Sequence, residues 1–149
     1  MWFKKKKKKE KFPVRDVAIE EIHAAIHQYE KELSENIPLR VLIQEDGSLD
    51  HSLLAPFLKA IPKQTYYMSK ETYEVFTEDD KHLAEALDIV QRAVDQYISQ
   101  TNSLPVIDHD PYQKVNFFKL EQLGLIKERP DIDFYISDLE HLVTMEKPD

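Results

Sequence analysis

Two short groups of histidine and aspartate are the residues of this 149-residue chain whose types and spacing could bind a metal or move a proton. His23 and His27 lie four positions apart, and on a helix this spacing places two imidazoles where they can chelate a metal ion. Asp108, His109 and Asp110 are consecutive, so they could bind a divalent cation or act as general acid and base. Each group also has a purely structural interpretation.

The structural interpretation is favoured for both groups. The histidine pair lies opposite the apolar stripe of its expected helix, where solvent exposure leaves no neighbouring groups to orient the imidazoles. Asp110 followed by Pro111 is typical of a helix start, Asp108 fits a turn closed by its own side chain, and His109 is expected to face water. We therefore predict no catalytic residue, no cofactor and no dedicated metal site. A metal-binding protein or metal-dependent enzyme that uses either group remains the alternative.

The composition excludes several kinds of chemistry. The chain has two glycines, Gly47 and Gly124, which lie too far apart for a glycine-rich phosphate loop. It has no cysteine, which excludes disulfides, zinc ribbons and thiol catalysis. Residues 112–149 hold five basic and eight acidic side chains, whereas a surface that contacts phosphates should be basic. Nucleic acid is therefore not an expected partner of the acidic main part of the chain.

Two long amphipathic helices are predicted from apolar residues that recur every three or four positions. The first covers residues 14–34 and follows Pro13. The second covers residues 78–101, with Thr77 as its expected cap and three acidic residues in its first turn. A third helix is expected from Asp110 to the stop at Gly124, and because its apolar residues lie nearly all round the axis, a segment that is partly strand is the alternative.

The remaining elements are short. The apolar run 37–43 predicts a buried strand, followed by the turn sequence EDGS. Residues 52–61 predict a short helix capped by Ser52. Residues 65–76 fit either a hairpin or a strand followed by a helical turn, and residues 134–145 are a hairpin candidate. The expected fold is α+β, with the two long helices packed on a small, mostly antiparallel sheet in one domain over residues 12–149.

Three stretches carry a resemblance to a known family. The sequences QTYYMSKETYEVF, DHDPYQKVNFFKL and LVTMEKP resemble a family of small uncharacterised proteins from spore-forming Gram-positive bacteria. The resemblance covers nearly all of the chain after the first eleven residues. It implies a bacterial cytoplasmic protein with a domain of unknown function. The family has no assigned activity, so the resemblance carries no functional residue over to this chain.

The first eleven residues, named the lysine arm below, carry the strongest charge in the chain. They hold seven lysines and one glutamate, whereas the other 138 residues hold 13 basic and 27 acidic side chains. A block of like charges repels itself and stays solvated, so we expect the arm to be disordered or a frayed helical extension. The candidate membrane- or anion-binding residues are Trp2, Phe3, Lys4, Lys5, Lys6, Lys7, Lys8, Lys9 and Lys11.

Three interpretations of the lysine arm stay open. It is a solvated tail with no specific partner, a handle that binds an anionic lipid surface, or a non-specific nucleic-acid binder. Lysines are attracted to anionic headgroups, and Trp2 and Phe3 suit the headgroup level of a bilayer. We expect a non-catalytic binding or adaptor module with a protein partner that the sequence does not identify. Its expected location is the cytoplasm, at the cytoplasmic face of a membrane when the arm binds lipid.

Overall fold

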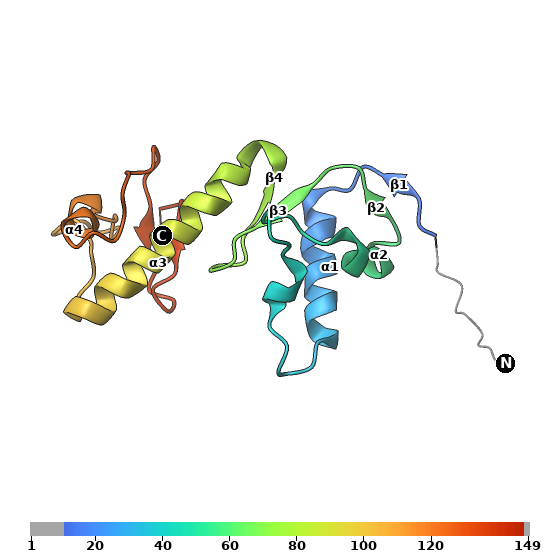
Figure 1. Ribbon diagram of the computed structural model, residues 1–149, viewed down its shortest axis with the longest axis horizontal. Helices are drawn as coiled ribbons and strands as arrows, with labels where there is room; N and C mark the ends of the chain where they lie inside the picture. Colours follow the sequence, from blue (N-terminus) through green and yellow to red (C-terminus); the bar gives the residue numbers. More distant parts are fainter. Residues whose placement is uncertain (1–10, 148–149) are drawn as a thin grey trace. The chain divides into compact units, whose positions relative to one another are not determined.

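The computed structural model describes residues 11–147 and divides the chain into two compact units, one ending at Thr65 and the other beginning at Tyr66. Each unit combines helices with short strands, so the predicted α+β class is confirmed (Figure 1). Apart from Lys11, the lysine arm lies outside the described residues. The single domain over residues 12–149 stays a prediction. Among the described residues, no helix is long and apolar enough to cross a membrane.

The first helix, α1, spans Ile19–Glu32 and so begins later than the predicted residue 14. Val14–Arg15 forms strand β1 instead, and it pairs in parallel with β2, Ile61–Pro62. The early start was wrong because β2 supplies the backbone hydrogen bonds that a helical turn would otherwise have provided. The Glu21 carboxylate caps α1 by accepting a hydrogen bond from the Ala18 N–H (2.9 Å). The buried side of α1 consists of Ile22, Ala25 and Ile26.

The predicted buried strand over 37–43 is wrong. The chain forms a 3-10 helix, η1, over Leu39–Leu42, and only Ile43 makes an isolated bridge, with Leu49. A 3-10 helix places residues three apart on one side, and Leu42 is buried while Val41 is 45% exposed. Leu42 is therefore the one buried residue of this apolar run. The turn that follows forms as expected, with Gly47 at a φ of 88°.

Helix α2 spans His51–Leu58 and packs against α1. Its cap is Asp50, which corrects the predicted Ser52. The Asp50 carboxylate accepts hydrogen bonds from the Ser52 N–H (3.0 Å) and from the Ser52 hydroxyl (2.6 Å). The rings of Tyr29 and Phe57 meet edge to face with centroids 6.0 Å apart, which adds an aromatic contact within this unit.

His51 makes the stability of the first unit dependent on pH. Its Nε2 atom is buried without a hydrogen-bond partner, and burial lowers the pKa of the imidazole below 6.5. Below the unfolded pKa of about 6.5, the unfolded chain binds a proton that the folded chain does not. The free energy of unfolding therefore decreases as the pH is lowered. We expect the midpoint of thermal unfolding to fall less between pH 7 and pH 5 in His51→Phe than in the unmodified protein.

His82 provides the control for this experiment, because it is exposed on another helix. His82→Phe should follow the pH dependence of the unmodified chain. Equal slopes for the unmodified protein and His51→Phe would show that His51 titrates alike in the folded and unfolded chain.

The second unit begins with a hairpin of β3, Tyr66–Met68, and β4, Val75–Thr77. This confirms the hairpin and removes the alternative of a helical turn. The strands are joined by a six-residue loop rather than a tight turn, so the Lys70–Glu71 pair does not have to form the turn alone. The Ser69 N–H donates to the Glu74 carbonyl (2.8 Å) at the base of the loop.

Helix α3, Lys81–Thr101, is the central element of the second unit and is preceded by the 3-10 turn η2, Glu78–Asp80. It packs against the β3–β4 hairpin, β6 and α4. Thr77 occupies the cap of η2, but its side chain makes no capping hydrogen bond. The helix ends at Asn102, which takes the left-handed conformation expected after a helix. The buried residues of α3 are Ala84, Leu87, Asp88, Val90, Gln91, Ala93 and Val94.

The predicted helix from Asp110 is wrong at its start. Helix α4 spans Phe117–Gln122, and Asn116 is its cap. Residues 106 and 115 form a bridge, which holds the intervening chain as a loop. Gly124 follows the helix with a φ of 69°, as predicted for a stop. The predicted last hairpin forms between β5, Tyr135–Ile136, and β6, Val143–Thr144.

The described strands form three two-stranded sheets, not the one small sheet predicted. Two of the three are antiparallel, and β1–β2 is parallel. The core of the second unit therefore lies between α3 and several short elements. Its buried residues are Phe76, Ala84, Leu87, Val90, Ala93, Val94, Val115, Leu120, Ile126, Phe134, Ile136 and Val143.

Candidate functional site

A polar pocket of about 490 Å³ lies in the second unit around the loop that follows α3. It contains all three members of the predicted Asp108–Asp110 group. Most of its other lining residues belong to the same loop, and Asp133, Tyr135 and Lys147 come from the β5 region and the C-terminal segment. The lining residues are Ile107, Asp108, His109, Asp110, Pro111, Tyr112, Lys114, Asp133, Tyr135 and Lys147.

Backbone pairing closes the base of this loop. The Ile107 N–H donates to the Lys114 carbonyl (2.9 Å), and Val106 bridges Val115. Lys114 in turn bridges Tyr135 in β5. The loop between residues 107 and 114 is therefore held as a closed turn beside the last hairpin. His109 and Gln113 have φ values of 68° and 56°, an uncommon conformation for residues other than glycine.

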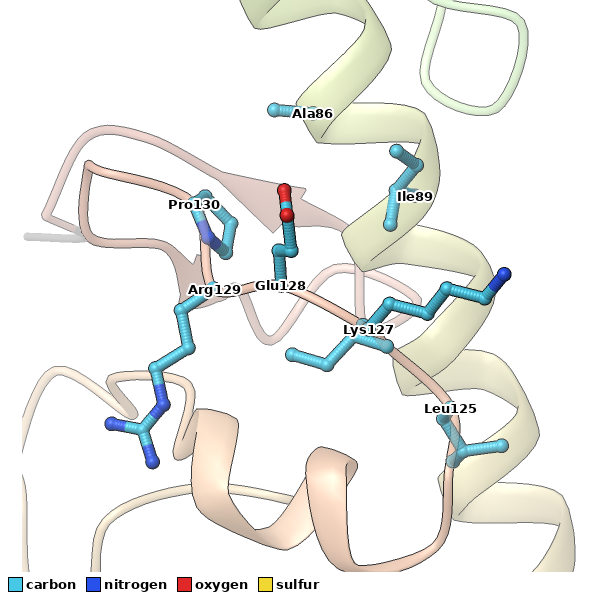
Figure 2. Close-up of a pocket in the computed structure, with 8 residues that line it drawn as sticks. Ala86, Ile89, Leu125, Lys127, Glu128, Arg129 and Pro130 are labelled. Carbon is cyan, nitrogen blue, oxygen red and sulfur yellow. The ribbon is translucent and has the colours of Figure 1, made fainter.

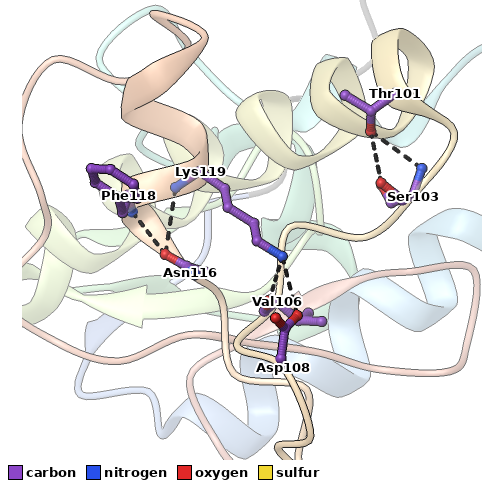
Figure 3. A network of polar contacts seen from close by, with 7 residues as sticks. All are labelled: Thr101, Ser103, Val106, Asp108, Asn116, Phe118 and Lys119. Carbon is purple, nitrogen blue, oxygen red and sulfur yellow. Dashed lines mark hydrogen bonds and ion pairs between the residues drawn. The ribbon is translucent and has the colours of Figure 1, made fainter.

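Lys119 of α4 ties the loop to the rest of the unit. Figure 3 shows its ammonium reaching the Val106 carbonyl (3.0 Å) and the Asp108 carboxylate (3.4 Å). The same view shows Asn116 accepting hydrogen bonds from the N–H groups of Phe118 (3.0 Å) and Lys119 (3.4 Å), which fixes the start of the helix. Asp108 therefore forms an ion pair with a lysine, where a self-closed turn was predicted.

The other charged groups of the pocket also have partners. The Tyr112 N–H donates to the Asp110 carboxylate (2.7 Å), so Asp110 closes a turn instead of starting a helix. The Lys114 ammonium lies 3.3 Å from the Asp133 carboxylate. The Lys147 ammonium lies 5.0 Å from the centre of the Tyr112 ring. The pocket thus offers both signs of charge, which suits contact with polar ligands, and its lining contains no serine, threonine or cysteine nucleophile.

The predicted metal alternatives find no support in this geometry. Within residues 11–147, no group of three or more histidine, aspartate or glutamate side chains could hold a metal ion. His23 and His27 are exposed on α1, on the side away from its buried residues. His109 is exposed, and the paired Asp108 carboxylate is directed to Lys119.

A second hollow of about 490 Å³ lies beside α3 (Figure 2). Ala86 and Ile89 approach it from the helix, and the segment from Leu125 to Pro130 forms the other side. Ile89 is 47% exposed. This hollow is not predictable from the sequence, because its two sides are more than thirty positions apart in the chain. The sequence signal that could have indicated one side of the hollow is Ile89, an apolar residue of α3 that lies outside its buried stripe.

The rim of this hollow is fixed by an ion pair. The Arg129 guanidinium donates two hydrogen bonds to the Glu121 carboxylate, at 3.0 and 2.7 Å. These hydrogen bonds lower the pKa of Glu121 and raise that of Arg129. Both side chains are partly exposed, so the pair positions the segment more than it stabilises the fold.

Comparisons with known proteins give one match. A family model described as "Protein of unknown function (DUF3939)" matches residues 12–145. No curated protein and no solved structure matches the chain.

Proposed function

The chain belongs to the DUF3939 family of proteins of unknown function, and from this premise we propose that it is a non-catalytic binding module held at an anionic membrane surface by its lysine arm. The supporting observation is the separation of charge along the chain. The arm carries seven lysines, whereas residues 12–149 carry 13 basic and 27 acidic side chains. The origin in spore-forming bacteria, the cytoplasmic location and the protein partner remain predictions.

Ion pairs in the described residues strengthen this separation. At least five of the 13 basic side chains outside the arm pair with carboxylates, so part of the positive charge there is neutralised within the chain. These pairs are Arg15–Glu21, Arg92–Glu71, Lys114–Asp133, Lys119–Asp108 and Arg129–Glu121. A negatively charged surface is therefore attracted mainly by the lysine arm.

The magnitudes favour a membrane surface. Each lysine near an anionic leaflet contributes about 1 kcal/mol of binding free energy, and Trp2 and Phe3 add contact at the headgroup level. An 11-residue segment can span at most about 36–40 Å. Repulsion between the acidic part of the chain and the membrane is screened within about 8 Å at physiological salt. The arm can therefore bind lipid while most acidic groups stay beyond the range of repulsion.

Co-sedimentation of the full chain with lipid vesicles tests this function. We expect the unmodified protein to pellet with vesicles that contain phosphatidylserine or phosphatidylglycerol, and to remain in solution with phosphatidylcholine vesicles. Changing the seven arm lysines to glutamine should weaken the partition by at least ~100-fold, because the lysines supply most of the attraction. Raising the salt concentration should release the unmodified protein.

Lys31 provides a matched control, because it is an exposed lysine in the last turn of α1. Lys31→Gln should bind like the unmodified chain. Equal binding by the unmodified protein and the seven-glutamine variant would contradict the proposal, as would failure of both to pellet. RNA included as a competitor reports the nucleic-acid alternative, which would be supported if RNA displaced the protein from vesicles at low concentration.

A further inference from the structure

Two apolar side chains lie exposed and side by side where the described chain begins. Val14 in β1 and Ile61 in β2 are direct partners in the parallel register, so they project from the same face of the strand pair. Val14 is 60% exposed and Ile61 is 37% exposed. The neighbouring partner Pro62 is buried on the other face. Figure 1 shows the two strands together in the first unit.

Backbone hydrogen bonds hold this pair rigidly. The Ile61 N–H donates to the Pro13 carbonyl (2.8 Å), and the Lys63 N–H donates to the Arg15 carbonyl (2.9 Å). The bonds bracket the Val14–Ile61 contact on both sides. The two apolar side chains are therefore part of the folded unit, although Val14 lies close to the end of the lysine arm in the sequence.

Exposed lysines lie close to the apolar pair in the sequence. Lys59 and Lys63 lie two residues before and after Ile61, and Lys11 lies three residues before Val14. Within residues 11–147, no carboxylate forms an ion pair with any of these three lysines. Asp16 is the exposed acidic residue closest to Val14 in the sequence among the described residues. The name "basal patch" is used below for Val14, Lys59, Ile61 and Lys63.

We infer that the basal patch contacts the same anionic bilayer as the lysine arm, and that this contact orients the first unit on the membrane. The inference rests on the proposed function. Apolar side chains with flanking lysines match a lipid surface because the apolar groups enter the headgroup boundary while the ammonium groups stay at the lipid phosphates. A lipid surface can bind the apolar side chains and the lysines of the patch, and also Trp2 and Phe3 of the arm. We therefore infer a lipid partner and not an acidic protein.

Chain length couples the patch to the arm. Val14 lies three positions after Lys11, and the distance between them is at most about 11 Å when the chain is fully extended. An arm bound along its whole length therefore brings the basal patch to the headgroup region. The patch and the arm then contact the membrane together. The end of the arm nearest Val14 is therefore not a flexible tether between the membrane and the first unit.

The distribution of acidic groups permits this approach. Residues 12–65 hold five basic and nine acidic side chains, whereas residues 66–149 hold eight basic and 18 acidic side chains. The unit that carries the basal patch is therefore the less acidic of the two. Arg15 on β1 is paired with Glu21 at 2.8 Å, so this neighbouring pair adds no net charge beside the patch.

Vesicle binding by full-length variants tests the patch. Val14→Thr combined with Ile61→Thr removes the apolar surface while keeping β-branched side chains that suit strands. Lys59→Gln combined with Lys63→Gln removes the charge. We expect the threonine pair to weaken partition into phosphatidylserine vesicles about fivefold, and the glutamine pair to weaken it about tenfold or more. Circular dichroism and thermal unfolding check that each variant is folded.

The same unit offers matched control variants. Ile37 and Val41 are 44% and 45% exposed, so Ile37→Thr with Val41→Thr removes a similar apolar area elsewhere. Lys31→Gln is the charge control. We expect both controls to stay within twofold of the unmodified protein. Patch variants that bind as tightly as the unmodified protein would overturn this inference while leaving the arm proposal intact. Absence of binding by the unmodified protein would overturn both.

The lack of native cysteine permits a direct measurement of orientation. Ile61→Cys and Val41→Cys can each carry an environment-sensitive fluorophore at a single position of the full chain. On addition of anionic vesicles, we expect a blue shift and an intensity increase at position 61 and no change at position 41. Equal responses at both positions, or no response at position 61, would contradict the proposed orientation.

Discussion

Asp88→Ala is expected to lower the free energy of unfolding by about 3 kcal/mol. Asp88 is 9% exposed on α3, and its carboxylate accepts three hydrogen bonds from the β3–β4 loop. The donors are the Ser69 hydroxyl (2.5 Å), the Lys70 N–H (3.1 Å) and the Glu71 N–H (3.0 Å). Hydrogen bonds to a charged group contribute about 1.5–3 kcal/mol each. Two of the three donors are only partly buried and can bond to water once the carboxylate is removed, so the net loss stays below the sum of three such bonds. Urea denaturation followed by circular dichroism measures the loss.

Two variants show whether the loss comes from these hydrogen bonds. Asp88→Asn keeps the shape but places an amide donor against the loop donors, so we expect an intermediate loss. Glu85→Ala removes an exposed carboxylate from the same helix and should change stability by less than about 0.5 kcal/mol. A loss in Asp88→Ala no larger than in Glu85→Ala would show that the carboxylate does not hold the hairpin loop.

Phe134→Ala is expected to lower the free energy of unfolding by about 3–5 kcal/mol. Phe134 is fully buried, directly before β5, and is part of the core around α3. Its ring meets Phe117 edge to face with centroids 6.4 Å apart, so truncation removes both apolar contact and an aromatic pair. The surrounding side chains relax only partly into such a cavity, which adds to the loss. Chemical denaturation again measures the change.

Phe118 is the matched control for this truncation. It lies next to Phe117 in α4 but is 54% exposed. Phe118→Ala should therefore cost less than about 1 kcal/mol, and Phe134→Leu should lose less stability than Phe134→Ala because it fills more of the cavity. Similar losses for Phe134→Ala and Phe118→Ala would contradict the position of Phe134 at the centre of this core.

Elements with local hydrogen bonds were the more predictable part of the fold. The helix over residues 81–101 and the hairpin over 134–145 follow from apolar spacing and from residues that end helices or form turns. The failures have a shared cause. Val14 fitted a helical stripe but pairs with Ile61, and the run 37–43 fitted a strand but makes no strand pairing within residues 11–147 beyond the Ile43–Leu49 bridge. Distant partners decided both segments.

In the candidate site, too, the sequence predicts some features and only the structure shows the others. The sequence identified Asp108, His109 and Asp110 as the densest chemical cluster, and these residues do line a pocket. Their roles depend on residues that the sequence does not place beside them. Lys119 pairs with Asp108, and Lys147 lies against Tyr112. The residue types allowed acid–base or metal chemistry as an alternative to the favoured structural interpretation, and the contacts show ion pairing and turn closure.

The sequence by itself determined the segregation of charge, the absence of cysteine chemistry and the local start and stop signals of several elements, because each depends on residues close together in the chain. The tertiary structure alone decided the burial of Asp88, the two pockets and the exposure of Val14 beside Ile61. Each of these arises from contacts between segments far apart in the sequence. Such contacts form through packing and strand pairing, and neither has a periodic signal along the chain.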